Sequence, residues 1–532
     1  MTIAAEFQAP SIEYSLLSPI LIIAGVAIVG VLVEAYAPRG LRYLIQTLLA
    51  LVGVTGALVA TVIIGMNLES LADGAAYGSI AAAGSVAVDG PSIFIWGTLL
   101  VLSLFSVLLF AERHLEGGVL SFAGQAAALP GTEAEREAST RGLEHTEVFP
   151  LMMFALSGMM LFPAANDLLT MFVALEVLSL PLYLLAGLAR RRRLLSQEAA
   201  LKYFMLGAFS SGFFIYGIAL VYGYAGSMEF AAISEAVSGR VGGQALLLGG
   251  IGMMSVGLLF KVGAAPFHAW TPDVYHGSPT AVTAFMAACT KIAAFGAMLR
   301  LFYVAFGGAR WDWTPMIWTV AILSMVVGSV IALSQTDVKR LLAYSAIAHS
   351  GFLLVGFVGL QQTDAGLLGI SSVQAVLFYL VTYGFMTIAA FAVVTMVRDG
   401  SGEATSLTRW AGLGKESPVV AGVFAFLLLG MAGIPLTSGF TGKVAVFGAA
   451  LDGGAWPLVV IAVLMSAVAA FFYVRVIVLM YFSEPVGEGP TVTMPSVLTT
   501  IVIAVGFTAT LVLGVAPGPV LDLAGAAGDF IR

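Results

Sequence analysis

The sequence predicts an all-α polytopic membrane protein with about 14 transmembrane helices. Of its 532 residues, 60% are hydrophobic and only 10% are charged, and the mean hydropathy is +1.00. Soluble chains are nearer half apolar and a quarter charged. A membrane-spanning helix needs roughly 20 apolar residues, so this composition suffices for about fourteen. These values exclude a soluble enzyme and a disordered protein. Continuous apolar runs also disfavour an outer-membrane barrel, whose strands alternate apolar and polar residues.

Fourteen apolar runs follow one another along the chain. In lipid each must be helical, because no water is present to satisfy the backbone. The runs lie near residues 16–36, 42–65, 92–110, 148–164, 168–189, 199–225, 244–267, 279–306, 314–334, 339–360, 366–397, 418–449, 457–482 and 495–516.

The runs divide the chain into five parts. We expect an N-terminal three-helix segment (1–110), a polar cytoplasmic loop (111–147), a first five-helix unit (148–310), a second (311–482), and a C-terminal helix with its tail (483–532). The loop is rich in Gly, Ala and Glu, and we expect it to be a solvated connection.

Basic residues orient the runs. Arg190–Arg193 follow the fifth run, and loops rich in Lys and Arg stay in the cytoplasm. Counting outward from there, the cytoplasmic loops hold fourteen basic residues, whereas the opposite side holds Arg240, Arg310 and Arg532. Both termini are then expected on the outer side of a bacterial plasma membrane. Residues 1–10 lack a basic n-region, so we expect the first run to be a span rather than a cleaved signal.

Matching features about 170 residues apart indicate two five-helix repeats, runs 4–8 and 9–13. Asp167 opens the fifth run and Asp337 the tenth, and two leucines precede Pro266 in the seventh run and Pro435 in the twelfth. Because five is odd, the second repeat would be inverted in the membrane, as in many ion transporters. Proline breaks helices, so we expect helices 7 and 12 to be broken, near 263–266 and 433–442.

The chain offers few ligands for a redox centre. Cys289 is its only cysteine, which excludes an iron–sulfur cluster, a disulfide or a zinc–thiolate site built by this chain alone. No phosphate-binding glycine loop follows a strand. We therefore expect no cofactor and no metal on this chain, and the lack of a polybasic tract argues against nucleic acid as a partner.

Seven charged residues inside the apolar runs are the unusual feature of this sequence. They are Glu176, Lys202, Lys261, Lys291, Arg300, Lys443 and Arg475. A charge in the bilayer costs at least about 2.5–3.5 kcal/mol, and such residues usually mark ion pathways. Lysine can release a proton when it is buried, whereas arginine cannot.

Position separates these charges into groups. Glu176, Lys261 and Lys291 lie deep in their runs, whereas Lys202 and Lys443 lie close enough to helix ends to reach the surface instead. The two arginines are expected in structural roles at helix ends or in interhelical pairs. For every member, the alternative is a charge that a neighbouring helix satisfies for structural reasons only.

Three histidines could take part in proton movement because histidine titrates near neutrality. His268 and His276 lie in and after the expected break of helix 7, and His349 lies in the middle of the tenth run. A lone histidine in a packed helix is more often a hydrogen-bonded structural residue, so this alternative stays open for His349 and is favoured for His276.

The segments Leu259–Tyr275, Gly277–Thr280, Asp337–Ser345 with His349, and Gly433–Phe440 with Lys443 resemble one family. This family is the antiporter-like, Mrp-related subunits of the bacterial proton-pumping NADH:quinone oxidoreductase, complex I. Within it the motifs are most similar to subunit N, whose mitochondrial counterpart is NADH dehydrogenase subunit 2. The resemblance covers runs four to thirteen.

The resemblance implies a non-redox subunit of a translocase that moves protons while quinone is reduced elsewhere. It implies a Glu176–Lys261 pair, a central relay lysine at Lys291 and a terminal one at Lys443, with Lys202 a further family lysine and with His268 between Lys261 and Lys291. FMN, iron–sulfur clusters and quinone would reside in partner subunits. Neighbouring partners would be subunit M and the small subunits J and K.

Three alternatives remain. The first is an Mrp-type cation/proton antiporter subunit without redox coupling, against which the subunit N motifs argue. The second is a structural role in which buried charges only hold helices together. The third, a major-facilitator solute carrier, lacks the cytoplasmic signature expected between the second and third runs.

Overall fold

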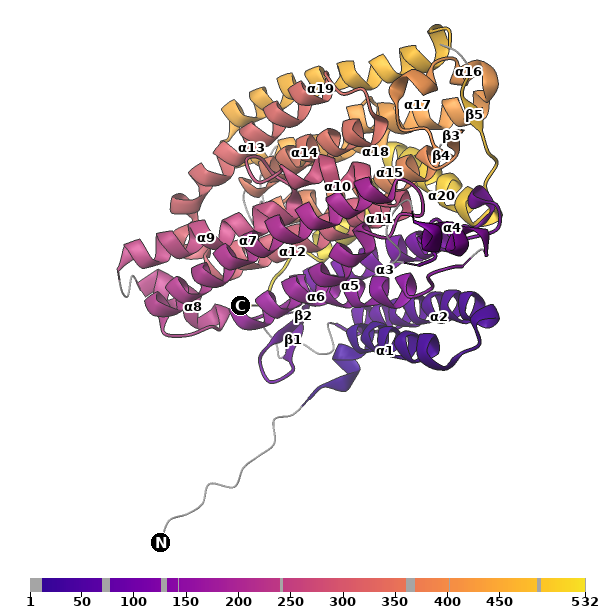
Figure 1. Cartoon of the computed structure of the whole chain (residues 1–532). Coiled ribbons are helices and arrows are strands. Elements are labelled where there is room, and N and C mark those ends of the chain that lie inside the picture. The colour runs from indigo at the N-terminus through magenta and orange to yellow at the C-terminus, as the bar shows by residue number, and fades with distance from the viewer. Residues whose placement is uncertain are drawn as a thin grey trace.

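The computed structural model of the chain describes residues 12–68, 77–125, 132–141, 143–239, 243–359, 369–400, 402–485 and 489–531. The residues expected at the two ends (1–10 and Arg532), Arg240 on the outer side and part of the 111–147 loop lie outside these ranges. Within them the fold is almost entirely helical, which confirms the predicted class (Figure 1).

The larger helices have the following bounds: α1 Tyr14–Tyr36, α2 Arg39–Met66, α3 Gly90–Phe110, α4 Glu133–Thr140, α5 Val148–Ala164, α6 Leu168–Ala186, α7 Arg193–Ala225, α8 Phe230–Gly239, α9 Gln244–Val262, α10 Trp270–Gly277, α11 Thr280–Phe285, α12 Lys291–Arg300, α13 Arg310–Ala332, α14 Val338–Phe357, α15 Ser372–Val394, α16 Leu413–Glu416, α17 Pro418–Ala432, α18 Ser438–Asp452, α19 Trp456–Phe482, α20 Val497–Val515 and α21 Gly518–Ala526. Two π-helical segments, Met286–Thr290 and Leu301–Ala305, join α11 and α12 into one continuous span and extend it.

The strands are short and peripheral. The hairpin β1 (Gly78–Ala81) and β2 (Val86–Asp89) precedes α3, and β3 (Val397–Asp399) pairs antiparallel with both β4 (Gly402–Glu403) and β5 (Thr491–Val492).

Each predicted apolar run coincides with helix in the structure. Among the described residues, 12 helices are long and apolar enough to cross a membrane. The fourth run forms a shorter helix, α5, and the twelfth is divided between α17 and α18. The number of fourteen crossings and the inverted relation of the two repeats stay predictions.

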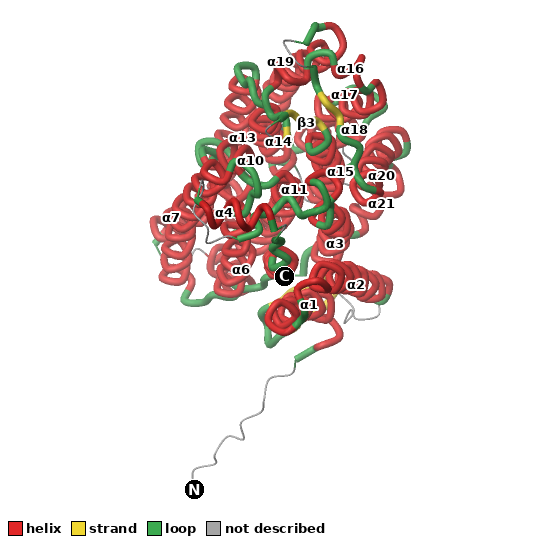
Figure 2. Tube along the Cα trace, turned by 45° about the vertical axis from the view of Figure 1, so that its right-hand side comes forward, coloured by secondary structure: helices red, strands yellow, loops and turns green. Residues whose placement is uncertain are grey.

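The helices form one bundle with a protected centre. Figure 2 shows α1 and α2 as a pair at one edge beside α3, with α6 and α7 on one side and α17–α19 on another. The span 280–305 is fully buried, and α14 and α15 are nearly so, whereas α7 and α19 expose apolar side chains such as Phe209 and Phe471. Lys261, Lys291 and Lys443, discussed below, therefore lie in the protected part of the bundle.

Three aspartates begin helices in the same way. Asp89, Asp167 and Asp337 each accept a hydrogen bond from the backbone N–H three residues on, at the start of α3, α6 and α14. Such N-caps satisfy amides that a helix leaves unpaired in its first turn. The shared cap at Asp167 and Asp337 supports the predicted repeat.

The two predicted helix breaks are confirmed. α9 ends at Gly263 with φ +69°, and α17 ends at Gly433 with φ +85°, so both use a glycine in the left-handed conformation. The chain resumes as α10 after the first break and as α18 after the second. Each break leaves the carbonyl oxygens of a helix C-terminus without helical partners inside the bundle.

The described part of the 111–147 loop is more ordered than a solvated connection. Glu112 accepts hydrogen bonds from the backbone and side chain of Ser496 (3.1 and 2.5 Å) and from Thr499 (2.7 Å), which start α20. Glu116 pairs with Arg191 (2.9 Å) and with Arg398. These carboxylates are bound by distant segments, so the described start of the loop is tied to the bundle. A solvated or partly disordered connection stays a prediction for the loop as a whole.

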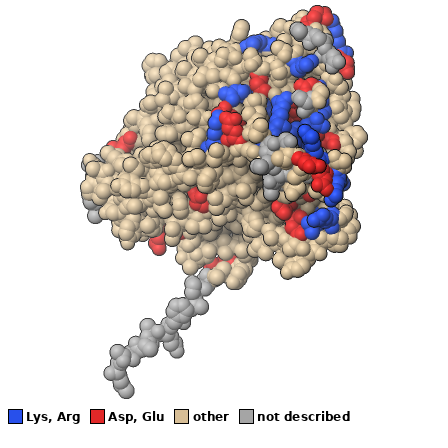
Figure 3. All heavy atoms as spheres, in the orientation of Figure 1, with Lys and Arg blue, Asp and Glu red and all other residues tan. Residues whose placement is uncertain are grey.

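Basic residues gather at one end of the bundle. In Figure 3 Lys and Arg are concentrated on the side where Figure 1 places α4, α16 and β3–β4, while the end that carries α8 and β1–β2 shows almost none. The first described residues of α1 and the last of the chain lie near that second end, since Glu13 accepts a hydrogen bond from Ala82 and the Ile531 N–H donates to Asp89. The basic residues that the sequence predicts on one side of the membrane therefore gather at one end of the bundle on the face that Figure 3 shows.

Arg300 has the structural role that was expected of it. It ends α12 and forms an ion pair with Asp89 (2.6 Å), and both side chains are completely buried. Arg300 also donates to the carbonyl of Pro163 (2.5 Å) and to Ser92 (2.8 Å). Arg475, also expected to be structural, donates to the Leu333 carbonyl at the other end of the bundle.

We expect Arg300→Met to destabilise the protein by about 3–5 kcal/mol, because it leaves the Asp89 carboxylate buried without its cation. The measurement is heat unfolding of the detergent-solubilised protein. Lys415→Met is the control, since Lys415 forms an exposed pair with Glu484 and such pairs contribute little. Equal unfolding temperatures for the two variants would contradict this role of Arg300.

Candidate functional site

Three of the predicted lysines are buried inside the bundle. Lys261 lies in the last turn of α9, Lys291 begins α12 directly after a π-helical segment, and Lys443 lies in α18 after the second break. Their exposed fractions are 2%, 3% and 4%. Among the described residues, none of the three forms an ion pair with a carboxylate within 4 Å.

Lys261 is held by hydroxyl groups and aromatic rings. Its ammonium donates to Ser179 Oγ (2.7 Å) and to the Tyr183 hydroxyl (3.3 Å), both on α6. The Tyr183 ring lies 5.5 Å from the same nitrogen, a distance at which a ring face attracts a cation. Among the described residues Lys261 is therefore held by hydroxyl groups and a ring face, without a carboxylate within 4 Å.

Glu176 lies on the same face of α6 as these two hydroxyl residues, at spacings of three and seven residues. Its Oε1 atom is buried and has no hydrogen-bond partner among the described residues. The Glu176–Lys261 pair that the family implies is thus not closed in this structure, and Ser179 holds the ammonium instead. Both partners are present, and the pair is open.

Lys291 binds the carbonyl oxygens that the first helix break leaves free. Its ammonium donates to the Val262 carbonyl at the end of α9 (3.1 Å), to the Ala346 carbonyl (2.7 Å) and to Ser350 Oγ. A helix C-terminus carries partial negative charge. The break therefore supplies an electrostatic partner for the lysine without supplying a carboxylate.

Lys443 repeats this arrangement at the second break. It donates to the carbonyls of Met431 (3.3 Å) and Ala432 (2.8 Å), which end α17, and to Ser466 Oγ (2.8 Å). A Cβ atom on Gly433 would lie 2.9 Å from Lys443 Cδ. Glycine is required there both for the left-handed turn and for the approach of the lysine.

Helix α14 lies between these two lysines. Ala346 and Ser350 bind Lys291, while the Phe352 ring lies 4.7 Å from the Lys443 nitrogen. His349, 1% exposed, lies in the same stretch and is hydrogen-bonded to Tyr379. His349 therefore lies on the stretch of α14 that contacts both lysines.

His268 and Lys202 lie away from this buried row. His268 is half-buried in the break after α9, with its ring 6.4 Å from that of Tyr344, and no hydrogen bond joins it to the described Lys261 or Lys291. The bridge expected from His268 is not formed in this structure. Lys202 is 42% exposed and pairs with Glu198 (2.7 Å) and Asp273 (2.8 Å).

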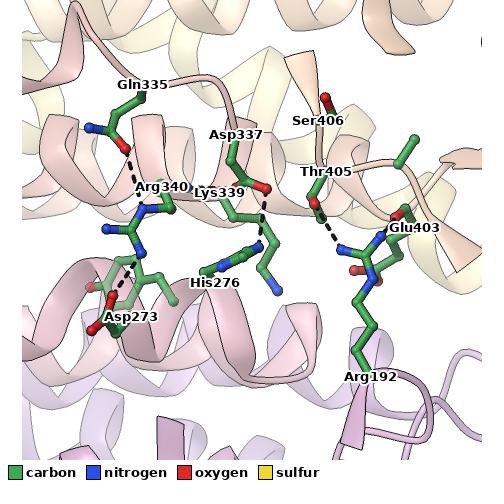
Figure 4. A network of polar contacts seen from close by, with 12 residues as sticks. Arg192, Asp273, His276, Gln335, Asp337, Lys339, Arg340, Glu403, Thr405 and Ser406 are labelled. Atoms are coloured by element: carbon green, nitrogen blue, oxygen red, sulfur yellow. Dashed lines mark hydrogen bonds and ion pairs between the residues drawn. The ribbon is translucent and has the colours of Figure 1, made fainter. Parts of the chain in front are cut away.

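Asp273 belongs to a polar network at the end of the bundle where cations gather (Figure 4). It also pairs with Arg340 (2.7 Å), and nearby His276 pairs with Asp337 (3.2 Å). Burial raises the pKa of Asp273, but the hydrogen bonds from Lys202 and Arg340 lower it more, so its pKa lies below its usual value. A cavity of about 60 Å³ adjoins the network, with Lys339, Ser278 and His276 in its wall.

The hydroxyl partners of the lysines were missed in the sequence. They are Ser179, Tyr183, Ser350 and Ser466, together with Tyr379 beside His349. One signal was available for two of them, because Ser179 and Tyr183 follow Glu176 on one helical face. Within the described residues no three His, Cys, Asp or Glu side chains gather closely enough to hold a metal ion.

The fold and the buried lysines define an antiporter-like polytopic membrane protein. Residues 165–469 match the transmembrane family described as NADH:quinone oxidoreductase/Mrp antiporter. NADH-quinone oxidoreductase subunit N from Nocardioides sp. is 69% identical, over 99% of this chain and 100% of that protein. Subunit N from Parafrankia sp. is 58% identical, over 99% of this chain and 98% of that protein.

Solved structures agree with these relatives. A chain of respiratory complex I from Thermus thermophilus with bound aureothin is 34% identical with a TM-score of 0.73, covering 96% of this chain and 99% of that one. A chain of the Mrp complex from Dietzia sp. has a TM-score of 0.78 at 19% identity, covering 97% of each chain, and shows the shared fold alone. The chain belongs to the family of NADH-quinone oxidoreductase subunit N.

We expect Gly433→Ala to displace Lys443 in addition to straining the turn. The control is Gly454→Ala, since Gly454 has a similar φ of +78° but open space around its Cβ position. Both variants carry a left-handed alanine, which costs about 1–2 kcal/mol. Thermal unfolding of the purified complex should show a larger loss for Gly433→Ala. Equal losses would mean that contact with Lys443 does not require glycine at 433.

Proposed function

We propose that this chain is the proton-translocating membrane-arm subunit of an NADH:quinone oxidoreductase, complex I, and that its protons move along Glu176, Lys261, Lys291 and Lys443. Its relatives are subunit N of this enzyme, which makes it a non-redox part of a translocase. The observation that supports the relay is the set of three buried ammonium groups without carboxylate partners among the described residues.

Lysine suits this task chemically. It is the cation that can give up its proton inside a protein, whereas arginine stays charged. Lys291 and Lys443 are held by carbonyl and hydroxyl oxygens that accept hydrogen bonds from an ammonium. A hydroxyl can also donate to a neutral amine, whereas a carbonyl cannot. The serine at each lysine can therefore serve either protonation state.

The open Glu176–Lys261 pair gives the relay its switch. When Lys261 turns from Ser179 to Glu176 it gains a negative partner, which favours its protonated form, and when it turns back it loses that support. A charge arriving near Glu176 from a neighbouring subunit would bias this choice. Lys202, His268 and His349 are secondary members, with Lys202 at the end where protons enter.

The remaining assignments concern the surroundings of the chain. We place it in the bacterial plasma membrane with both termini on the outer side, in line with the concentration of basic residues at the opposite end. Other complex I subunits are its partners, and among them we assign subunits M, J and K as neighbours. FMN, iron–sulfur clusters and quinone belong to partner subunits, and this chain binds none.

An Mrp-type antiporter subunit without redox coupling is the alternative. It shares the fold, and the two assignments differ in the partner subunits with which the chain assembles. Co-purification with flavin- and iron–sulfur-containing subunits favours the complex I assignment, whereas a complex without them would favour the antiporter.

We expect Lys261→Ala to lower NADH-driven proton transport about tenfold or more per assembled complex, since removal of a proton-transfer group commonly costs about 10²–10⁴-fold in rate. Lys261→Arg should fail as well, because it keeps the charge but cannot release its proton. Lys415→Ala, at an exposed ion pair, is the control and should pump normally. Transport is measured as acidification of inside-out vesicles, with assembly checked on native gels. Normal pumping by assembled Lys261→Ala would remove Lys261 from the relay.

A further inference from the structure

A chain of hydrogen bonds crosses the second half of the bundle at His349. The His349 ring is hydrogen-bonded through Nδ1 to the Tyr379 hydroxyl on α15 (2.7 Å) and through Nε2 to the Tyr473 hydroxyl on α19 (3.4 Å). Tyr473 is in turn hydrogen-bonded to Ser345 on α14. All four side chains are at most 2% exposed, so the chain runs through the interior.

The two ends of this chain of hydrogen bonds lie toward different parts of the molecule. Ser345 lies one helical turn before His349, on the side of the Asp337 cap and of the polar network in Figure 4. Tyr379 packs against α18, since a Cβ on Gly442 would lie 2.6 Å from the Tyr379 ring. The residue after Gly442 is Lys443. The hydrogen bonds therefore lead from the half of α14 that is nearest the end of the bundle rich in Lys and Arg toward Lys443.

Both ring nitrogens of His349 are hydrogen-bonded to tyrosine hydroxyls, which distinguishes the hydroxyls of Tyr379 and Tyr473 from other buried hydroxyls. Tyr383 lies just as deep and its ring is closer to His349 (5.3 Å) than that of Tyr379 (6.0 Å), yet its hydroxyl makes no hydrogen bond to the histidine in the part of the chain that the structure describes. Ring packing around the histidine thus does not require a bonded hydroxyl. Tyr379 and Tyr473 instead fix one imidazole between two groups that both donate and accept.

We propose that Ser345, Tyr473, His349 and Tyr379 form a proton path from the cytoplasmic side that joins the relay at Lys443. The proposal rests on the proposed function. It makes the two tyrosines and Ser345 proton-carrying residues and gives His349 a direct role in the relay.

The transfer balances at each atom. Ser345 takes a proton from cytoplasmic water and gives its own hydroxyl proton to Tyr473, whose hydroxyl proton passes to His349 Nε2. The ring then releases its Nδ1 proton to Tyr379, and the Tyr379 proton passes to the neutral amine of Lys443, through water where the two are not in contact. Every hydroxyl breaks one O–H bond as it forms another, and the imidazole is left as its other tautomer. Rotation of the hydroxyls and a flip of the imidazole ring, which exchanges Nδ1 and Nε2, reset the path.

The test compares Tyr473→Phe with Tyr383→Phe in the assembled complex. Each change removes one hydroxyl and keeps the ring, but only Tyr473 lies in the path. We expect Tyr473→Phe to lower NADH-driven proton transport about tenfold, and Tyr383→Phe to leave it near that of the unmodified complex. Ser345→Ala should also lose transport, and Ser345→Thr, which keeps the hydroxyl, should restore it.

The outcomes separate this path from the relay as a whole. If Lys261→Ala abolishes transport while Tyr473→Phe and Ser345→Ala pump normally, the path is wrong and the proposed function stands. If Tyr383→Phe loses as much as Tyr473→Phe, the tyrosines act by packing and the path is also wrong. If Tyr473→Phe fails to assemble, the two Ser345 variants decide. Loss of proton transport in Ser345→Ala with restored transport in Ser345→Thr supports the path, whereas equal transport by the two variants overturns it.

Discussion

The arrangement of the buried lysines depends on one interaction, that of an ammonium group with the carbonyl oxygens of a broken helix. Lys291 binds the end of α9 and Lys443 binds the end of α17. The free carbonyl oxygens at a buried helix end need hydrogen-bond donors, and a buried ammonium needs acceptors. Each group therefore offsets the free-energy cost of burying the other. A carboxylate in the same place would hold the proton on lysine far more firmly. Carbonyls and hydroxyls stabilise the ammonium without a full negative charge, which is compatible with the proposed relay.

The left-handed glycines are what make this interaction possible. Gly263 and Gly433 end their helices without a side chain at the turn, and the following segments re-enter the bundle as α10 and α18. Each break holds a lysine at its free carbonyl end, Lys291 from α12 at the first and Lys443 from the resuming helix α18 at the second. Helix α14, packed between them, contacts both lysines through Ala346, Ser350 and Phe352.

Much of this could be predicted from the sequence. Apolar runs fix where helices lie, because the bilayer permits no other backbone, and glycine with proline marks the breaks. Charges in such runs identify the site, since their cost allows few of them. The partners could not be predicted in the same way. Backbone carbonyls have no side-chain signature, and Ser179 lies 82 residues from Lys261.

Long-range contacts account for the two differences. The 111–147 loop was expected to be solvated, but Glu116 meets Arg398, 282 residues away. The resemblance implied a Glu176–Lys261 pair, but the relative placement of α6 and α9 brings Ser179 to the ammonium. Such choices depend on packing of distant helices, which residue types alone do not determine.

The π-helical segments on both sides of α12 have a mechanical consequence. A π-helical turn holds more residues than an α-helical turn and occurs often where a helix serves a function. Here one such segment precedes Lys291 and another follows Arg300. The ten residues of α12 between them form a stiff rod, anchored at its far end by the Asp89 ion pair. A displacement of Lys291 along the helix axis is then passed through α12 to the Arg300–Asp89 ion pair, while the wide turns on either side separate this rod from the rest of the span.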